Sequence, residues 1–161
     1  MADNEQKDDG LDIFQEFGTN EKLELEGVWV EFGGGLQLLI ARMNNPNYAK
    51  LRDEKVKPYR NLPNGIPKEA AEKILVDCMA GAILLGWRGK PLRFKGEVLE
   101  YSVPNALKVL GVKDFRESVL LVSNEASVYR DAVITQARKN SPTSSAGATG
   151  TGADENSTMN G

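Results

Sequence analysis

A run of three glycines at residues 33–35 separates two apolar segments and restricts the fold more than any other feature of the sequence. Before the run, Val28, Val30 and Phe32 recur at every second position, which is the period of a β-strand. Glycine adopts positive φ angles without steric cost, so the run permits a tight turn between two antiparallel strands. The sequence therefore predicts a β-hairpin in this region.

The two sides of this hairpin differ in their patterns. The return strand, residues 36–42, is apolar on both faces apart from Gln37, so we expect helices over one face and partial cover over the other. Residues 23–26 alternate in the phase opposite to that of the strand after them, and Gly27 lies where the phase changes. We expect residues 23–26 to extend the first strand, with a β-bulge at Gly27 that exchanges the buried face.

Helical spacing is clearest after Pro67, which suits the first position of a helix. Apolar residues recur there at intervals of three and four from Ala71 to Leu85, and this pattern predicts the central core helix. The other expected elements are a helix starting at Asn45-Pro46, an extended arm or loop over residues 90–101, a short helix capped by Ser102, and a helical region over residues 114–138 with a break near residues 123–124.

These elements predict one small α+β domain over residues 21–140, in which a β-hairpin packs with three or four helices. Residues 1–20 are expected to form a flexible acidic arm, because they bury too little apolar surface to offset the entropy of ordering. Residues 141–161 are rich in Ser, Thr and Gly and predict a flexible tail. Within the arm, the apolar run at residues 11–17 is expected to dock, either on a partner or on the domain itself.

Charge is divided unevenly along the chain. Residues 1–26 hold nine acidic side chains and two basic ones, whereas residues 27–140 hold eighteen basic and twelve acidic side chains. The acidic arm and the basic core can therefore attract each other. Such an attraction can shield charge within one molecule, or it can link neighbouring copies head to tail in a homo-oligomer.

The composition excludes several kinds of chemistry and argues against an enzyme. The chain has no histidine, which rules out Ser-His, Cys-His and His-metal arrangements within it. The single cysteine, Cys78, lies in an apolar run and is expected to be a small buried side chain. The glycine run at residues 33–35 lacks the lysine and hydroxyl residues of a phosphate-binding loop, and Gly89-Lys90 is followed by Pro91 where such a loop has Ser or Thr. We therefore expect no catalytic residues, no cofactor and no metal site.

Functional residues are consequently sought among groups that can hold another polypeptide. Trp29 has the phase opposite to that of Val28 and Val30, so it is expected either to stay partly exposed or to pack under a helix or the arm. The candidate partner-binding residues are Trp29, Phe32, Leu36, Leu39, Tyr48, Lys55, Lys57 and Arg60.

Several short motifs follow one another along the chain: Gly27-Val28-Trp29-Val30-Glu31-Phe32 with Gly35, then Ile40-Ala41-Arg42, Asn45-Pro46-Asn47-Tyr48, Gly86-Trp87, Tyr101-Ser102-Val103-Pro104-Asn105-Ala106-Leu107 and Phe115-Arg116. In their order, over roughly residues 23–139, the chain resembles the tail assembly chaperones of long-tailed phages.

This resemblance implies a non-catalytic assembly factor that binds the tape-measure protein, keeps it soluble and helps to recruit tail-tube subunits. It also implies a location in the cytoplasm of the host bacterium and absence from the mature virion. The N-terminus lacks the order of charged and apolar residues of a signal peptide, which agrees with that location. Members of the family are often also made in a longer, frameshifted form, which would be a further partner.

A nucleic-acid-binding protein is the alternative. Residues 50–60 hold five basic side chains against two acidic ones, and Tyr48 and Tyr59 lie close by. Basic groups interleaved with aromatic rings suit contacts to phosphates and stacking on bases. The pI of about 5.2 and the acidic arm count against this function, and a solvated basic helix face explains the same residues.

Overall fold

The computed structural model describes residues 9–130, and the chain divides into two compact units. One unit is Thr19–Arg130, and the other combines the two ends of the chain. In the latter, α1 (Ile13–Phe17) begins after Asp12, whose carboxylate accepts hydrogen bonds from the backbone of Phe14 and Gln15. The first eight residues of the predicted arm, the predicted tail at 141–161 and the last part of the predicted helical region lie outside the described residues.

The predicted hairpin is confirmed as β1 (Val28–Gly33) and β2 (Leu36–Ile40). Its turn depends on Gly33 and Gly34, which adopt φ angles of 109° and 63°. A third antiparallel strand, β3 (Leu84–Gly89), pairs with β2, so that β2 lies in the centre of the sheet. A central strand carries side chains on two covered faces, which accounts for its apolar composition.

The prediction that residues 23–26 extend the first strand was wrong, because they belong to the helix α2 (Glu21–Glu26). The Asn20 side chain accepts hydrogen bonds from the backbone N–H groups of Lys22 and Leu23 and thereby caps the helix. Gly27, with φ of 91°, ends the helix instead of forming a bulge. Four alternating residues fit either structure, and here the caps at both ends favour the helix.

The central helix is confirmed as α4 (Lys68–Ala82), but it ends earlier than predicted. Pro67 lies at its N-cap position, one residue before the predicted place. The apolar residues after Ala82 form β3 and do not continue the helix, so the expectation of only two strands was also wrong. Pairing with β2 decides this segment, which periodicity alone leaves ambiguous between helix and strand.

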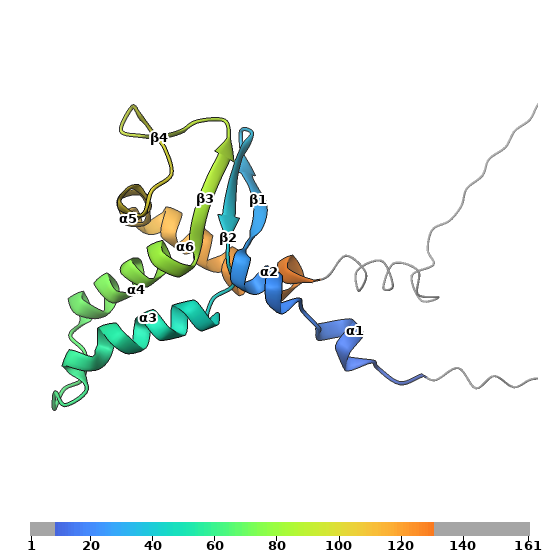
Figure 1. The fold of residues 1–161 in the computed structure, drawn as a ribbon, viewed down its shortest axis with the longest axis horizontal. Helices are drawn as coiled ribbons and strands as arrows, with labels where there is room; N and C mark the ends of the chain where they lie inside the picture. The colour runs from blue at the N-terminus through green and yellow to red at the C-terminus, as the bar shows by residue number, and fades with distance from the viewer. Residues whose placement is uncertain (1–8, 131–161) are drawn as a thin grey trace, which may run out of the picture. The chain divides into compact units, whose positions relative to one another are not determined.

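In the view of Figure 1, α3 and α4 lie together below the sheet, and β4 and α5 lie on the side of β3. The α3 helix is capped by Asn45 and the α5 helix by Ser102, so both start where predicted. The α3 helix runs beside α4. The predicted extended arm is a small hairpin of two strands, β4 and β5. The break in the last helical region falls between α6 and a short 3-10 helix, η2. The bounds are α3 (Pro46–Val56), η1 (Lys57–Tyr59), β4 (Leu92–Phe94), β5 (Glu97–Leu99), α5 (Val103–Leu110), α6 (Lys113–Asn124) and η2 (Ala126–Tyr129).

The core lies between the inner face of the sheet and the helices, which confirms the α+β fold. Tyr129 is fully buried, and its hydroxyl donates a hydrogen bond to the Ile40 carbonyl oxygen at 3.2 Å. The Trp87 indole N–H donates to the Leu99 carbonyl oxygen at 2.9 Å and holds the β4–β5 hairpin on the domain. No helix within residues 9–130 is long and apolar enough to cross a membrane. Further core side chains without solvent exposure are Leu38, Met79, Ile83, Leu84, Leu110 and Val119.

Candidate binding groove

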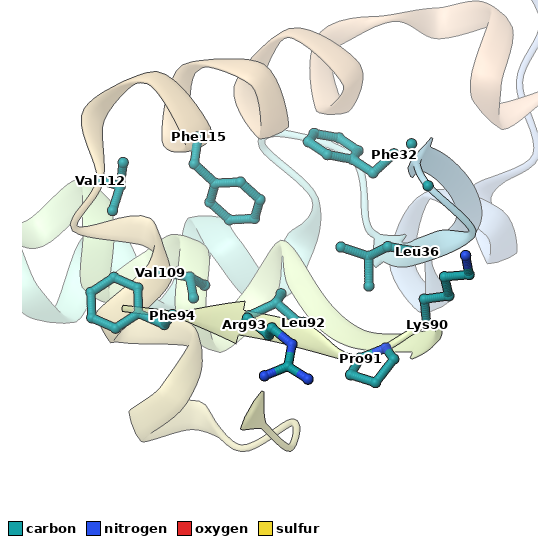
Figure 2. A pocket seen from close by; sticks show the side chains of 12 residues that line it. Phe32, Leu36, Lys90, Pro91, Leu92, Arg93, Phe94, Val109, Val112 and Phe115 are labelled. Atoms are coloured by element: carbon teal, nitrogen blue, oxygen red, sulfur yellow. The ribbon is translucent and has the colours of Figure 1, made fainter. Parts of the chain in front are cut away.

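An apolar groove of about 500 Å³ opens beside the turn of the first hairpin (Figure 2). It lies between three parts of the domain: the β1–β2 turn, the β4 strand with the residues before it, and the corner between α5 and α6. Its volume lies within the usual range for sites that enclose a small ligand or a few side chains. The groove is lined by Phe32, Gly33, Gly34, Leu36, Lys90, Pro91, Leu92, Arg93, Phe94, Val109, Val112 and Phe115.

The first wall follows from the glycine turn. Phe32 is the last side chain before the turn, and Leu36 is the first one after it. Gly34 and Gly33 carry no side chains that would fill the space above them, and an added Cβ at either position would meet no atom within 4 Å. The Phe32 ring packs edge-on against Phe115 of α6, with centroids 5.7 Å apart. This contact joins the hairpin to the helical wall of the groove.

The second wall is the β4 strand. Leu92 is buried and Phe94 is half-buried, whereas the intervening Arg93 is exposed, as alternation along a strand requires. Lys95 lies in the tight turn to β5, with φ of 51°, and its ammonium lies 5.5 Å from the Phe94 ring centroid. The strand therefore presents an apolar face to the groove and positive charge around it.

The third wall is the corner between α5 and α6, where Val109, Val112 and Phe115 line the groove. Val112 occupies the N-cap position of α6 and is 47% exposed. Arg116 stabilises this corner through two hydrogen bonds. Its guanidinium donates to the Leu110 carbonyl oxygen at 2.9 Å and to the Glu72 carboxylate at 2.8 Å. The corner is thus tied both to the end of α5 and to α4.

The groove has an apolar floor and a positive margin. Lys90 and Arg93 are its charged lining residues, and no acidic side chain within residues 9–130 lines it. Figure 2 shows both side chains at the edge of the groove, away from the rings of Phe32 and Phe115. This arrangement suits an apolar segment of polypeptide that carries acidic side chains beside its apolar ones.

Two of the sequence-predicted residues, Phe32 and Leu36, meet in this groove. Trp29 and Leu39 pair with each other in the sheet and do not line it. The Trp29 ring is half-buried under the guanidinium of Arg88, which lies 3.9 Å from the ring centroid. The sheet therefore separates these four candidates into two pairs.

The other predicted residues lie on or after α3, and none lines the groove. Tyr48 is 5% exposed, and burial raises the pKa of its hydroxyl. Lys55 lies 3.4 Å from the Asp77 carboxylate of α4. Lys57 and Arg60 are exposed near the end of α3. The structure thus leaves exposed basic groups in this region but little surface of the Tyr48 ring.

Sequence reasoning missed the helical wall of the groove. Val109 and Val112 come from elements distant in sequence from the glycine turn, so no local pattern connects them with it. One local signal existed, because a valine follows Gly111 at a helix start where a polar capping residue is usual. Such a residue is favoured when its side chain has an apolar surface to contact.

Cys78, the cysteine of the chain, does not line this groove. Cys78 is fully buried in α4, and burial raises the pKa of its thiol. Within residues 9–130, no group of three or more acidic or cysteine side chains is placed to hold a metal ion. The chemistry available at the groove is therefore the burial of apolar groups beside positive charge.

A family model described as "YdaY prophage protein" matches residues 43–140, which is more than half of the chain. The matched range includes the β4 wall and the α5–α6 corner, whereas the β1–β2 hairpin precedes it. No curated protein and no solved structure matches the chain.

Proposed function

We propose a function for this chain from one premise: it belongs to the YdaY prophage protein family and is therefore phage-derived. The proposed function is that of a tail assembly chaperone. In this proposal it binds the tape-measure protein in the cytoplasm of the host bacterium, keeps it soluble and helps to recruit tail-tube subunits. It is absent from the mature virion. The single observation that carries the proposal is the apolar groove with its positive margin.

The groove fits the chemistry of such a partner. A tape-measure protein is long and largely helical, and it exposes apolar stripes until the tail tube closes around it. A groove binds such a helix through side chains spaced three or four residues apart on one face. Phe32, Phe94 and Phe115 give the groove aromatic contact surface, which contributes most where it is fully desolvated.

One groove of this size buries too little surface for tight binding by itself. Many copies along one long partner compensate, because each bound copy covers part of an extended apolar stripe. Recruitment of tail-tube subunits then uses another surface of the domain. The half-buried Trp29, with Arg88 stacked on it, is our candidate for that contact.

The proposal includes no catalysis. It is supported by the absence of histidine from the sequence and by the burial of the Cys78 thiol, which raises its pKa. Binding free energy alone accounts for the proposed role, since holding a partner in solution requires no bond to be made or broken.

Co-expression with the tape-measure protein of the same phage genome tests the function. We expect the long protein to stay in the soluble fraction and to co-purify with this chain. The variant Val112→Asp places a carboxylate in the groove while adding a favourable N-cap to α6, so it should fold but release the partner. Val103→Asp is the matched control, because Val103 has the same 47% exposure and does not line the groove.

Two outcomes would contradict the proposal at different levels. If the tape-measure protein precipitates equally with and without this chain, the chaperone function is wrong. If Val112→Asp and Val103→Asp both retain the partner fully, the function stands but the groove is not the binding site.

The second candidate function is nucleic-acid binding through α3 and η1. Lys50, Arg52, Lys57 and Arg60 are exposed there, although the exposed Asp53 and Glu54 interrupt them. This candidate predicts a salt-dependent shift of labelled single strands, which Lys57→Glu with Arg60→Glu should abolish. The chaperone proposal predicts that neither substitution affects retention of the tape-measure protein.

A further inference from the structure

The N-terminal segment, defined as residues 9–17, carries apolar side chains with no cover. Ile13, Phe14 and Phe17 fall on one side of α1 and are 63%, 64% and 64% exposed, and Leu11 just before the helix is 63% exposed. Large apolar side chains gathered in this way mark a site of interaction more often than isolated ones do. The segment therefore has the character of a ligand for an apolar surface.

The N-terminal segment and the groove are complementary in charge as well as in polarity. The segment contains Asp9, Asp12 and Glu16 and no basic side chain. The groove is lined by Lys90 and Arg93 and by no acidic side chain. Apolar contact supplies the attraction, and the opposite charges around it select this segment over a neutral or basic one.

We infer that the groove of one copy binds the N-terminal segment of a second copy, so that copies of this chain associate head to tail. The rings of Phe14 and Phe17 enter the apolar groove beside Phe32 and Phe115. The acidic side chains of the segment lie at the margin formed by Lys90 and Arg93. This contact does not depend on the chaperone function proposed above.

The length of the chain favours a second copy over the segment's own domain. Asn20 is held at the end of the sheet away from the glycine turn, because its N–H donates to the Tyr129 carbonyl oxygen at 2.7 Å and Tyr129 in turn bonds to Ile40. Figure 1 shows α2, which begins after Asn20, at that end of the sheet. The five steps from Val28 to Gly33 cover about 17 Å at the usual rise of a strand.

The connection to α1 is too short to cover that length. Three peptide steps join Asn20 to Phe17, which allows at most about 10 Å. Because residues 13–17 are helical, they add only about 1.5 Å each. Even with the connection fully extended, the Cα atoms of Phe14 and Phe17 stay short of the glycine turn of their own domain. This disfavours binding there, whereas the groove of another copy is free of this restriction.

A contact between two different surfaces has consequences for assembly. Head-to-tail contacts of this kind form a ring if the rotation closes and an open chain if it does not. The groove is also the site that we assign to the tape-measure protein, so a groove filled by an N-terminal segment is blocked for that partner. Self-association and partner binding then compete at each groove.

Sedimentation velocity of the full chain, over a wide range of concentration, tests this inference without any partner. We expect species heavier than the 17.6 kDa monomer, with weaker association at high salt. Val112→Asp blocks the groove, and Phe14→Asp with Phe17→Asp removes the apolar ligand. Each should weaken self-association on the order of tenfold or more. Val103→Asp adds the same charge as Val112→Asp but lies outside the groove, and Gln15→Asp adds a negative charge to the segment without removing an apolar side chain. Both should associate as the natural chain does.

Mixing the two defective chains gives the decisive result. The copy with the altered segment keeps a working groove, and the copy with the altered groove keeps a working segment. The mixture should therefore form a dimer of one copy of each, although each chain alone associates only weakly. A natural chain that is monomeric throughout, a Val112→Asp variant that associates like Val103→Asp, or a mixture without dimers would each overturn the inference.

Discussion

Arg116→Met should destabilise the domain by about 2–4 kcal/mol, because the Arg116 guanidinium donates a hydrogen bond to the buried carbonyl oxygen at the end of α5. The side chain is 7% exposed, and its guanidinium donates to the carbonyl oxygen of Leu110, the last residue of α5. The last carbonyl groups of a helix lack partners within the helix, and positive charge is favourable there. Methionine keeps much of the apolar volume but removes the donor.

The magnitude follows from two contributions. Leaving a buried carbonyl without its partner costs about 1–3 kcal/mol, and a hydrogen bond from a charged donor is worth about 1.5–3 kcal/mol, with overlap between the two. The ion pair with Glu72 adds little, because the Glu72 side chain is 58% exposed and such pairs are worth about 0–1 kcal/mol. Glu72→Gln is therefore the matched control, with an expected loss below about 1 kcal/mol.

Urea unfolding followed by the fluorescence of Trp29 and Trp87 measures both variants, with the slope m compared to confirm two-state behaviour. The reasoning is refuted if Glu72→Gln loses as much stability as Arg116→Met, since the ion pair would then support the corner. It is also refuted if Arg116→Met loses less than about 0.5 kcal/mol, since the Leu110 carbonyl would then need no partner.

Three further predictions concern burial and backbone conformation. Burial raises the pKa of the Tyr129 hydroxyl in the folded state. Above about pH 10 the unfolded state therefore releases this proton while the folded state retains it. The free energy of unfolding should consequently fall as the pH rises. Tyr129→Phe should flatten this alkaline loss in urea titrations, at a cost of about 1–2 kcal/mol at neutral pH for the lost hydrogen bond. Gly27→Ala should lower the free energy of unfolding by more than about 1 kcal/mol, because φ is 91° and a Cβ would lie 3.1 Å from Leu39. Gly34→Ala, at φ of 63° with open space around it, should lower the free energy of unfolding by less. Thermal melts of the two variants compare these losses. The buried Cys78 thiol should react with an alkylating agent only in denaturant, and rapid labelling of the native protein in a mass spectrum would contradict its burial.

Several elements were predictable because local chemistry determines them. The glycine turn fixes the first hairpin, and the capping side chains of Asn45 and Ser102 fix the starts of α3 and α5. The spacing after Pro67 identifies α4. In each case the decisive residues lie within a few positions of the element that they determine.

One error arose where a distant partner decides the structure, and the other where local caps outweigh a short alternation. The apolar residues that follow Ala82 continue a helical spacing, and only the pairing of Leu84 with Ile40 shows that they form a strand. Residues 23–26 alternate like a strand, but Asn20 and Gly27 cap them as a helix. Both caps were visible in the sequence, and they outweigh an alternation of four residues.

The candidate site was predictable only in part. Phe32 and Leu36 stood out through their places beside the glycine turn, and both line the groove. Val109 and Val112 come to the groove through the packing of α5 and α6, to which Arg116 contributes. No pattern near the hairpin points to them, because the groove exists only once the three walls have folded together.

Amide hydrogen exchange of this chain, with and without the tape-measure protein, tests the central claim most directly. The claim is that the groove beside the glycine turn holds an apolar segment of a partner polypeptide. We expect slower exchange in residues 90–95 and 109–115 when the partner is bound, with exchange in residues 50–60 unchanged. Protection confined to residues 50–60, or no protection of either groove wall in a complex that has formed, would contradict the account.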